Sequence, residues 1–576
     1  TIALLPTGGG KSLCYQLRSL AAPGLTIVIS PLIALMKDQV DALSEQGIQA
    51  TFLNSSLSRE ASAQCRRRLE NSEYRLLYVA PERLALDGML EQLERWQLSF
   101  IAVDEAHCIS EWGHDFRPEY RQLSLLRDRF PDVPIMALTA TATLRVRNDI
   151  SQLLKLRSPA SYVASFNRPN LSYRIIQRDQ PLKQLIEVIR DHPGESGIIY
   201  CLSRAGTERI AQALNAKGFS ALAYHAGLDA EERTKRQEQF INDEVPIIAA
   251  TIAFGMGIDK PDVRYVIHHD LPKNLESYYQ ETGRAGRDGL PSECVMLYSA
   301  GDAVKLHRFI DELSSPQERD IARDHLRSLL RFAESSTCRR IELLRYFGEQ
   351  YLSPTGAAPD FCGACDNCLT PRPSFDGTLA AQKILSCAVR IKQKSGFSVG
   401  LLHLVDVLCG AKTEKVAKFG HDSLSTYAIG KDRPRAEWLS YANELIQLGL
   451  LQICPERFNV AEVTESGAAV LRGLQFVELH QPLVKAGLSV EKRKLQRRRT
   501  GHVEVDPVLF GALRRLRLDI AREIKLPAYL IFSDATLQQM ALLKPKSEAE
   551  MLQVSGVGDV KLKRYGARFL QVINNS

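Results

Sequence analysis

A glycine-rich loop that ends in Lys-Ser is the feature of this chain that most limits how it can fold. Residues 6–12 read Pro-Thr-Gly-Gly-Gly-Lys-Ser, with an apolar run before them and an apolar stretch after them. Consecutive glycines let backbone N–H groups turn inward around a phosphate, and the N-terminus of a following helix favours the same negative charge. Lys11 can then reach the β and γ phosphates, while the Ser12 hydroxyl ligates Mg²⁺. The sequence therefore predicts a strand, a phosphate-binding loop and a helix.

One position of this loop departs from the general phosphate-loop pattern, because Leu5 stands where the pattern has glycine. On its own, the segment could also be an ordinary glycine-rich turn. We expect the following residues to hold the nucleotide: Thr7, Gly8, Gly9, Gly10, Lys11 and Ser12.

An acidic pair follows a second apolar run further along the chain. Residues 99–103 read Ser-Phe-Ile-Ala-Val and lead directly into Asp104-Glu105-Ala106-His107. A buried parallel strand carries such carboxylates to the carboxyl edge of its sheet, where the ligands of these folds bind. Asp104 then suits the Mg²⁺ shell, and Glu105 suits the polarisation of an attacking water. A helix start with acidic capping is the alternative, and the phosphate loop upstream argues against it.

Length and composition describe a folded chain of several domains. The chain has 576 residues, of which 45% are hydrophobic and 24% are charged. No apolar stretch reaches the roughly 18 residues of a membrane-spanning helix, and the first residues do not resemble a signal peptide. We therefore expect a cytosolic protein with no membrane partner. The chain begins without Met, inside its first predicted strand, so we also expect an N-terminal piece to be missing.

The positive charge of the chain is concentrated in one segment. The formal net charge is +7, and residues 491–530 carry eleven Lys or Arg against five Asp or Glu. A basic segment of this kind indicates a polyanionic partner. Twelve cysteines in a cytosolic chain argue against a disulfide framework. Four of them have the spacing of metal ligands, and we expect the other eight to be buried apolar residues.

Apolar runs alternate with polar, helix-patterned segments over the first part of the chain. One set of runs lies at residues 2–5, 26–30, 76–79, 100–103 and 135–138. A second set lies at residues 198–200, 221–224, 247–250, 265–267 and 294–298. This alternation predicts two parallel α/β units in tandem. Pro169 interrupts the pattern within residues 166–171, which we interpret as the hinge between two lobes, and beyond residue 300 we expect helices without strands.

An ordered series of motifs resembles the RecQ family of DNA helicases, and the resemblance extends over essentially the whole chain. The motifs lie at residues 6–12, 30–40, 104–107, 138–143, 253–259 and 278–287. The resemblance implies an α/β fold with two tandem RecA-like parallel-sheet lobes, a helical zinc-binding subdomain, a winged helix and a small all-α HRDC domain. It also implies an ATP-dependent enzyme that moves 3′ to 5′ on single-stranded DNA. Such an enzyme unwinds duplex or branched DNA in recombination, replication-fork processing and repair.

The resemblance divides the chain into six parts. The boundaries that we expect are 1–165 and 166–300 for the two lobes, 301–372 for the zinc-binding subdomain, 373–480 for the winged helix, 481–500 for a basic linker and 501–576 for the HRDC domain.

The second lobe carries two arginines in the run Gly283-Arg284-Ala285-Gly286-Arg287. By resemblance, Arg287 is the arginine finger that reaches across the cleft, and Arg284 and Gln280 lie close to the phosphates. A cation from the far lobe stabilises the transferring phosphoryl group only when the lobes close, which can be worth about 10³ to 10⁵ in rate. Surface arginines on a loop are the alternative.

Aromatic side chains recur at helical spacing after the acidic pair, at Trp112, Phe116 and Tyr120. Core packing is the simplest interpretation of that spacing. Arg117 lies among them, however, and loops of aromatic and arginine side chains stack on unpaired bases at about 1 to 3 kcal/mol per base. In the resembled family this loop couples contact with a single strand to hydrolysis. We therefore expect Trp112, Phe116 and Arg117 to bind DNA.

Four cysteines, Cys338, Cys362, Cys365 and Cys368, have the spacing of a metal site. Four thiolates that converge tetrahedrally suit a structural Zn²⁺, and a closed shell leaves no open catalytic position. An Fe–S cluster is the alternative, and the family resemblance favours zinc. Residues 353–360 look like a loop insertion that leaves these ligands intact.

The remaining segments resemble the DNA-binding domains of the family. Residues 375–475 are similar to its winged helix, where His421 and Ser423 are candidate phosphate contacts and single-stranded DNA-binding protein is a candidate partner. Residues 527–536 resemble the signature of the HRDC domain, in which Tyr529 is a candidate DNA contact. The implied ligands and partners are therefore ATP, Mg²⁺, Zn²⁺, and single-stranded and duplex or branched DNA at the nucleoid.

Two other functions are alternatives to a DNA helicase. An RNA helicase can also carry an Asp-Glu-Ala-His string, but the zinc-binding, winged-helix and HRDC-like segments argue against it. A non-catalytic scaffold that binds DNA junctions is the second, and intact Lys11, Asp104, Glu105 and Arg287 argue against that. The resembled family places its adenine-recognition motif before the first lobe, so we expect that motif in the missing piece.

Overall fold

A computed structural model describes residues 1–6, 8–31, 33–54, 57–84, 88–113, 115–254, 260–299, 301–352, 361–454, 460–481, 506–524 and 526–575. These residues form two compact units. One comprises Thr1–Leu329, Arg340–Cys365 and Arg493–Ser576, and the other comprises Leu330–Arg339 and Asp366–Lys492. Thr7, the predicted insertion at 353–360, most of the motif at 253–259 and all but the first residue of the predicted linker at 481–500 lie outside the described residues.

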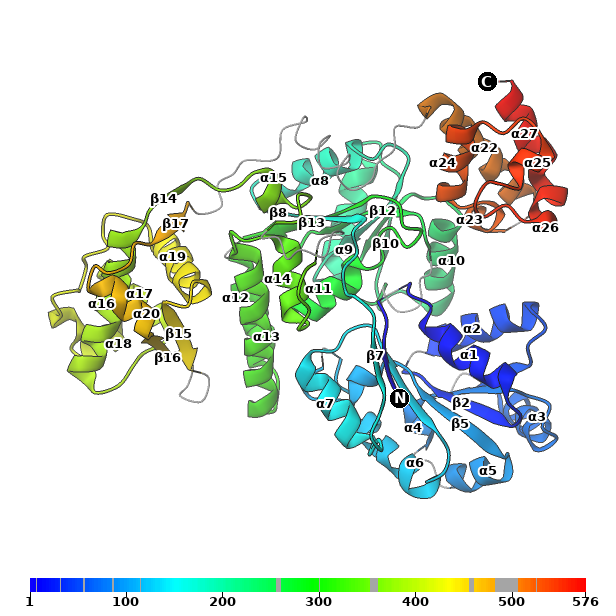
Figure 1. Ribbon diagram of the computed structural model, residues 1–576, viewed down its shortest axis with the longest axis horizontal. Coiled ribbons are helices and arrows are strands. Elements are labelled where there is room, and N and C mark those ends of the chain that lie inside the picture. The colour runs from blue at the N-terminus through cyan, green and yellow to red at the C-terminus, as the bar shows by residue number, and fades with distance from the viewer. Residues whose placement is uncertain are drawn as a thin grey trace. The chain divides into compact units, whose positions relative to one another are not determined.

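The first lobe is built on a sheet of seven parallel strands, in the order β3-β4-β2-β5-β6-β1-β7 (Figure 1). The strands are β1 (Ile2–Leu4), β2 (Leu25–Ile29), β3 (Ala50–Leu53), β4 (Leu76–Val79), β5 (Leu98–Val103), β6 (Ile135–Thr139) and β7 (Ser161–Val163). Every residue of β2 and β4 is buried, as expected for parallel strands that are covered on both faces. The helices are α1 (Lys11–Ala21), α2 (Ile33–Glu45), α3 (Arg59–Glu70), α4 (Pro81–Leu84), α5 (Met89–Arg95), α6 (Ser124–Arg129) and α7 (Leu144–Leu153).

The second lobe repeats this plan with six parallel strands, in the order β10-β11-β9-β12-β13-β8. The strands are β8 (Leu171–Gln177), β9 (Ser196–Tyr200), β10 (Ala221–Tyr224), β11 (Ile247–Ala250), β12 (Val263–His268) and β13 (Ser292–Tyr298). The helices are α8 (Pro181–Arg190), α9 (Arg204–Asn215), α10 (Ala230–Ile241) and α11 (Leu275–Thr282), followed by α12 (Asp302–Asp311), α13 (Pro316–Glu334) and α14 (Arg339–Tyr346).

The prediction of two parallel α/β lobes in tandem is confirmed, and each predicted apolar run coincides with a strand. Three further strands, β3, β7 and β8, were not predicted. β7 is exposed along its whole length, and β8 contains the buried Arg174, so neither presents a clean apolar run. The predicted hinge at 166–171 is the segment that joins β7 of one sheet to β8 of the other.

The second compact unit contains both helices and strands. Its helices include α15 (Asp366–Leu369), α16 (Thr378–Ser395), α17 (Leu401–Cys409), α18 (Glu414–Lys418), α19 (Arg435–Gln447) and α20 (Glu465–Leu471). Its strands form two antiparallel pairs, β14 (Ser374–Asp376) with β17 (Glu478–His480), and β15 (Leu451–Cys454) with β16 (Val460–Val463). The prediction that strands end at residue 300 is therefore wrong. The sequence did not indicate these strands because each is too short to show a clear period-two pattern.

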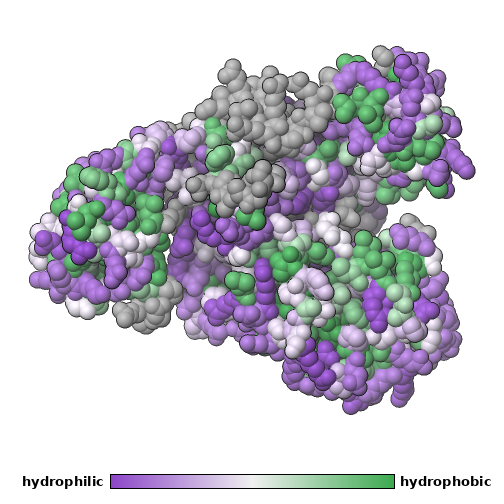
Figure 2. Space-filling view, viewed as in Figure 1, coloured by the Kyte–Doolittle hydropathy of each residue, from purple (hydrophilic) through white to green (hydrophobic). Residues whose placement is uncertain are grey.

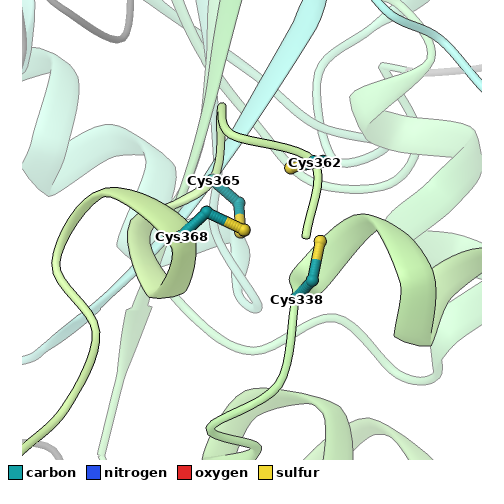
Figure 3. Close-up of side chains that lie close together, drawn as sticks. All are labelled: Cys338, Cys362, Cys365 and Cys368. Atoms are coloured by element: carbon teal, nitrogen blue, oxygen red, sulfur yellow. The ribbon is translucent and has the colours of Figure 1, made fainter. Parts of the chain in front are cut away.

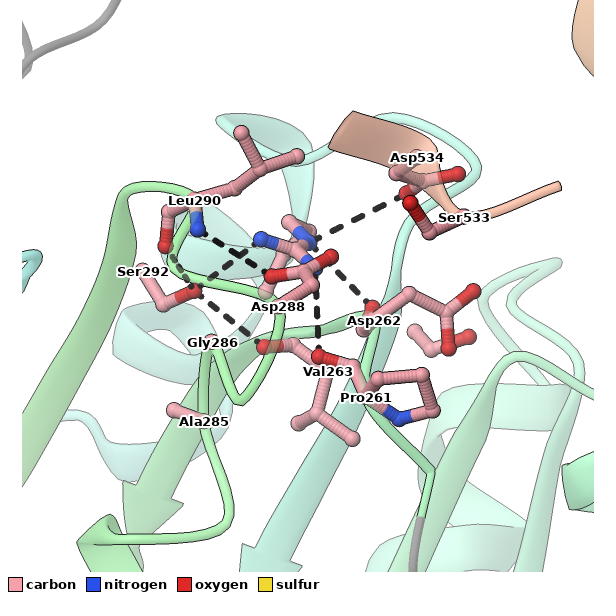
Figure 4. Close-up of polar contacts among 12 residues, drawn as sticks. Pro261, Asp262, Val263, Ala285, Gly286, Asp288, Leu290, Ser292, Ser533 and Asp534 are labelled. Carbon is pink, nitrogen blue, oxygen red and sulfur yellow. Dashed lines mark hydrogen bonds and ion pairs between the residues drawn. The ribbon is translucent and has the colours of Figure 1, made fainter. Parts of the chain in front are cut away.

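The C-terminal residues form a small helical bundle around a buried core. Its helices are α22 (Pro507–Ile524), α23 (Ala528–Ile531), α24 (Asp534–Leu543), α25 (Glu548–Met551), α26 (Asp559–Lys561) and α27 (Ala567–Asn574). Arg517 Nη2 lies 2.8 Å from Asp534 Oδ1, and both side chains are buried. Figure 4 shows Asp534 beside Asp262 and the loop that precedes β13. Asp534 also lies 4.0 Å from Arg264 of β12, so charged side chains of the bundle and of the second lobe form one buried network.

Hydrophilic side chains cover most of the face shown in Figure 2, with hydrophobic patches among them. Leu13, Leu17 and Leu20 lie along one side of α1, and each is more than half exposed. Within the described ranges, no helix is both long and apolar enough to cross a bilayer.

Gly197 of β9 is a position where the second lobe has no room for a side chain. A Cβ at Gly197 would lie 1.9 Å from the ring of Tyr265, which is fully buried on the neighbouring strand β12. We expect Gly197→Ala to lower the free energy of unfolding by about 1 to 3 kcal/mol, the usual cost of an overfilled core, as measured by urea unfolding. Gly511→Ala in α22 is the control, because no atom lies within 4 Å of its Cβ and alanine favours a helix. Equal stability of the two variants would contradict this packing.

Candidate functional site

The backbone of residues 8–10 has the geometry of a phosphate-binding loop. Gly8 and Gly10 have φ angles of 81° and 77°, in the left-handed region that residues with a side chain rarely adopt. α1 begins directly after Gly10, so its N-terminal N–H groups and the positive end of its dipole lie at this loop. Lys11 Nζ lies 3.5 Å from the carbonyl oxygen of Leu5, which places the ammonium group over the same loop.

Asp104 and Glu105 lie next to each other at the carboxyl end of β5. The Asp104 N–H donates to the Ile29 carbonyl at 2.8 Å, and Asp104 Oδ1 accepts from the Glu105 N–H at 3.0 Å. Glu105 has a φ of 46°, which is uncommon outside glycine and holds the pair in a strained turn. Burial raises the pKa of Asp104, the Glu105 carboxylate raises it further, and the Lys11 charge opposes both effects.

The oxygen donors around this pair fit Mg²⁺. The Asp104 carboxylate and the Ser12 hydroxyl are the hard ligands that this ion prefers. Burial also raises the pKa of Glu105, and the charges of Lys11 and Arg284 oppose the rise. A divalent cation would add to their effect, because it stabilises the charged form of both carboxyls.

His107 connects the acidic pair to the next strand. Its Nδ1 atom lies 2.8 Å from Thr139 Oγ1, at the end of β6, and 3.3 Å from Glu105 Oε2. Burial lowers the pKa of His107 to about 3, so the imidazole is neutral at physiological pH. The Tyr120 hydroxyl donates to the Asp104 carbonyl at 2.9 Å and fixes the turn from the other side.

Arg284 and Arg287 reach this site from the second lobe. Both lie on the loop between α11 and β13. A Cβ built on Gly8 would lie 3.3 Å from Arg287 Cγ, so the Arg287 side chain packs directly on the phosphate-binding loop. Arg284 is buried, and its charge acts on Glu105 and on Tyr200. Gln280 lies on α11, one turn before Arg284, and is half-buried.

The aromatic segment after the acidic pair presents rings and cations together. Trp112 and Phe116 are both half-buried. The Arg145 guanidinium lies 3.4 Å from the centroid of the Trp112 ring, and the Arg121 guanidinium lies 5.2 Å from that of Phe116. Tyr120 is fully buried, so core packing describes this residue but not the two rings before it. Aromatic and cationic groups in this arrangement suit unpaired bases and phosphates.

Arg117 holds this segment against the rest of the first lobe. Its Nε and Nη2 atoms each lie 3.2 Å from Asp115 Oδ2, and its Nη1 atom donates to the Pro31 carbonyl at 3.2 Å. Pro31 belongs to the motif at residues 30–40. Arg117 therefore joins two motifs of the lobe, and a direct contact between Arg117 and DNA stays a prediction.

The four predicted metal ligands lie together in the structure. The Sγ atoms of Cys338, Cys362, Cys365 and Cys368 all lie within 4.8 Å of one another (Figure 3). Cys338 directly precedes α14, and Cys368 lies within α15, so the site joins segments that are distant in sequence. Four sulfur donors in a closed group are the ligand set of a structural Zn²⁺.

A second group of possible metal ligands, Cys201, His269 and Asp270, lies at the carboxyl edge of the second sheet. Arg178 Nη2 lies 3.3 Å from Asp270 Oδ1, and the Leu202 N–H donates to Asp270 Oδ2 at 3.1 Å. Burial also raises the pKa of the Cys201 thiol well above its usual range. Arg178 already balances the carboxylate charge and Cys201 is protonated, so these residues form an ion-paired cluster.

The structure contradicts the expectation that His421 contacts a DNA phosphate. His421 is completely buried, with Nε2 2.5 Å from Ser395 Oγ and Nδ1 2.8 Å from His403 Nε2. Both ring nitrogens therefore have partners inside the second unit, and His421 supports the fold. Ser423 is exposed, and its hydroxyl donates to the Gly420 carbonyl at 2.7 Å. Tyr529 is half-buried on α23, and DNA contacts from Ser423 and Tyr529 stay predictions.

Sequence reasoning missed one residue that contacts a loop of the candidate site, Arg168. The sequence alone predicts only a hinge between the lobes at residues 166–171. In the structure, Arg168 donates to the backbone of the loop that carries Arg284 and Arg287. The sequence offered one signal for such a role, a long cationic side chain next to the conformationally restricted Pro169. It could not show the acceptor of Arg168, because Gly283 lies more than a hundred residues later.

Removal of one thiolate tests the metal site. We expect Cys365→Ser to lose its zinc and to unfold at a lower temperature, because zinc-binding free energy contributes directly to folding. Metal analysis of the purified protein and a thermal melt measure the two effects. Cys409→Ser is the matched control, since Cys409 is a half-buried cysteine outside the cluster. Zinc content equal to that of the control would show that these cysteines do not bind the ion.

Five family models match the chain in order. They are the DEAD/DEAH box helicase at residues 1–150, the helicase conserved C-terminal domain at 180–289, the RecQ zinc-binding domain at 300–369, the RQC domain at 371–486 and the HRDC domain at 506–573. The zinc-binding match covers all four clustered cysteines and favours zinc over an Fe–S cluster.

Curated relatives match the chain from end to end. It is 45% identical to the ATP-dependent DNA helicase RecQ of Pasteurella multocida (strain Pm70), with 100% of this chain and 88% of that protein covered. It is 39% identical to the protein of the same name from Bacillus subtilis (strain 168), with 100% and 93% covered. The identity, the coverage and the ordered domains lead to one conclusion: the chain belongs to the RecQ family of ATP-dependent DNA helicases.

Proposed function

We propose that this chain is an ATP-driven motor that moves 3′ to 5′ along single-stranded DNA and separates duplex or branched DNA. Membership of the RecQ family supports ATP-dependent DNA unwinding, and the direction and the tracking of one strand rest on the resemblance. The observation that supports a working motor is the position of Arg287, which lies on the phosphate loop of the other lobe. On the same ground we propose roles in recombination, replication-fork processing and repair.

The first lobe supplies most of the groups for hydrolysis. The N–H groups of residues 8–10 and the Lys11 ammonium hold the phosphates, and Ser12 and Asp104 hold Mg²⁺. An Mg²⁺ ion held by these two residues would neutralise part of the phosphate charge. Glu105 orients and polarises the attacking water.

The second lobe completes the site. Arg287 stabilises the charge that develops on the transferring phosphoryl group, with Arg284 and Gln280 beside it. These groups reach the phosphates only when the lobes are closed, so each round of hydrolysis alternates closed and open lobes. The aromatic segment at Trp112 and Phe116 follows the acidic pair directly, so a base that stacks there can move Glu105.

Other partners follow from the same resemblance. We propose that the winged helix and the HRDC domain bind duplex and branched DNA, and that single-stranded DNA-binding protein docks on the winged helix. We also propose a place at the nucleoid in the cytoplasm. An RNA helicase and a non-catalytic junction scaffold are the competing functions. The RQC and HRDC matches disfavour the first, and the assembled charged site disfavours the second.

Loss of the loop ammonium tests the ATP site. We expect Lys11→Ala to lower DNA-stimulated ATP hydrolysis by at least about 100-fold, because it removes a cation from the transition state. Binding to a single-stranded oligonucleotide should change little, since Lys11 faces the nucleotide. Phosphate release and fluorescence anisotropy measure the two properties.

Lys155→Ala is the matched control for this experiment. Lys155 lies on the same lobe, is half exposed and pairs with Asp128 on the surface. Its hydrolysis rate should equal that of the unmodified chain. Unchanged turnover in the Lys11 variant would reject the ATP site, and stronger activation by RNA than by DNA would favour the RNA helicase. Unwinding of 5′-tailed but not 3′-tailed duplexes would reverse the proposed direction.

A further inference from the structure

The loop that carries Arg284 and Arg287 has no regular structure to hold its backbone in place. It runs from Gly283 to β13, and Gly286 within it has a φ of 55°. A Cβ at Gly286 would lie 2.5 Å from Asn170 Nδ2, so other segments approach the loop closely. Backbone carbonyls in such a loop need donors from elsewhere in the protein. Such donors would fix the backbone conformation in which the Arg287 side chain packs on the phosphate-binding loop.

Arg168 supplies three of these hydrogen bonds. Its Nη1 atom donates to the Gly283 carbonyl at 3.2 Å. Its Nη2 atom donates to the carbonyls of Ala285 at 2.9 Å and of Gly286 at 2.8 Å. One guanidinium therefore spans the backbone on both sides of Arg284 and ends at the residue before Arg287. A planar fork with several fixed N–H groups suits three acceptors, whereas an ammonium is a single point of charge.

Asn170, two residues later, holds the far end of the same loop. Its Nδ2 atom donates to the Gly286 carbonyl at 2.9 Å and to the Leu290 carbonyl at 2.8 Å. The backbone around Arg287 is thus tied at both ends to the segment that joins the two sheets. That segment also packs against α11, because the Tyr279 hydroxyl donates to the Phe166 carbonyl at 3.1 Å.

A second arginine fixes the segment that bears Arg168. Arg340 is buried, and its Nη1 atom donates to the Arg168 carbonyl at 2.7 Å and to Asn167 Oδ1 at 2.6 Å. Its Nη2 atom donates to the Leu171 carbonyl at 2.5 Å. Arg340 lies two residues after the metal ligand Cys338, on α14. Arg340 also interacts with the thiol of Cys362, so the segment that bears Arg168 is linked to a residue of the cysteine cluster.

We propose that Arg168 is a positioning residue for the arginine finger, which fixes the backbone of residues 283–286 so that Arg287 meets the triphosphate. The inference rests on the proposed role of Arg287 in hydrolysis. Arg168 donates to backbone carbonyls of the loop and acts through Arg287. The connection between the lobes is therefore also part of the hydrolytic site.

A charge-conserving variant is the sharpest test, because it keeps the cation and removes the fork. We expect Arg168→Lys to lower kcat for DNA-stimulated ATP hydrolysis by about 10- to 100-fold, since a displacement of about 1 Å in a catalytic group can cost about 10²-fold. The KM for ATP should change less than about threefold, because the phosphate loop in the first lobe is untouched. An unchanged kcat would overturn the proposal.

Two further variants guard against a purely structural effect. Arg190→Lys is the matched control, because Arg190 is an exposed arginine at the end of α8 in the same lobe, and its kcat should equal that of the unmodified chain. Asn170→Ala removes the other tie to Gly286 and should lower kcat in the same sense. If Arg168→Lys lost kcat only in proportion to a loss of folded protein, measured by circular dichroism, the proposal would also fail.

A double-mutant cycle separates this proposal from the function on which it rests. Arg287→Ala alone should abolish most of the hydrolysis, and normal turnover in that variant would reject the finger itself. If Arg168 acts through Arg287, adding Arg168→Lys to Arg287→Ala should cause no further loss. If the two effects multiply, Arg168 acts independently of the finger and the proposal is wrong, while the proposed function stands.

Discussion

The rest of the structure depends on the charge balance of two adjacent carboxylates at the end of β5, the buried Asp104 and the half-buried Glu105. Burial raises the pKa of both Asp104 and Glu105, and their charged forms are stable only beside cations. Lys11 is supplied by the same lobe, and Arg284 comes from the other one. The cations that stabilise the charged carboxylates come from both lobes. The protonation state of the acidic pair therefore depends on whether the two lobes are closed on each other. That dependence supports the proposed link between hydrolysis and movement on a strand.

The arginines of the second lobe are held by a continuous set of contacts that reaches the metal cluster. Arg340, close in sequence to Cys338, fixes the segment between the lobes, and Arg168 in that segment fixes the loop of Arg287. On the far side of the same loop, Arg264 pairs with Asp288, the residue after Arg287. Arginine side chains therefore cross-link loops here. Arg168 and Arg340 donate to backbone carbonyls, and Arg264 pairs with a carboxylate.

Local sequence patterns predicted the two lobes and the main motifs of the site. They could not predict contacts between residues that are distant in the sequence. Contiguous motifs identified the phosphate loop, the acidic pair and the cysteine cluster, because the chemistry of each lies in a short stretch or a fixed spacing. Strand β7 was missed because it is short and exposed, and β8 because Arg174 interrupts its apolar run. His421 looked like a surface ligand, yet hydrogen bonds to Ser395 and His403 allow the ring to be buried. Arg168 was taken for a hinge residue, since nothing nearby shows that its acceptors lie more than a hundred residues later.

The central claim is that a guanidinium from the second lobe completes the hydrolytic site of the first. The most direct measurement is a crystal structure of the chain with single-stranded DNA, ADP and aluminium fluoride, which imitates the transferring phosphoryl group. The account predicts an Arg287 guanidinium nitrogen at hydrogen-bonding distance, about 3 Å, from a fluoride ligand, with Glu105 beside the attacking water. Closed lobes with Arg287 turned to solvent would contradict it.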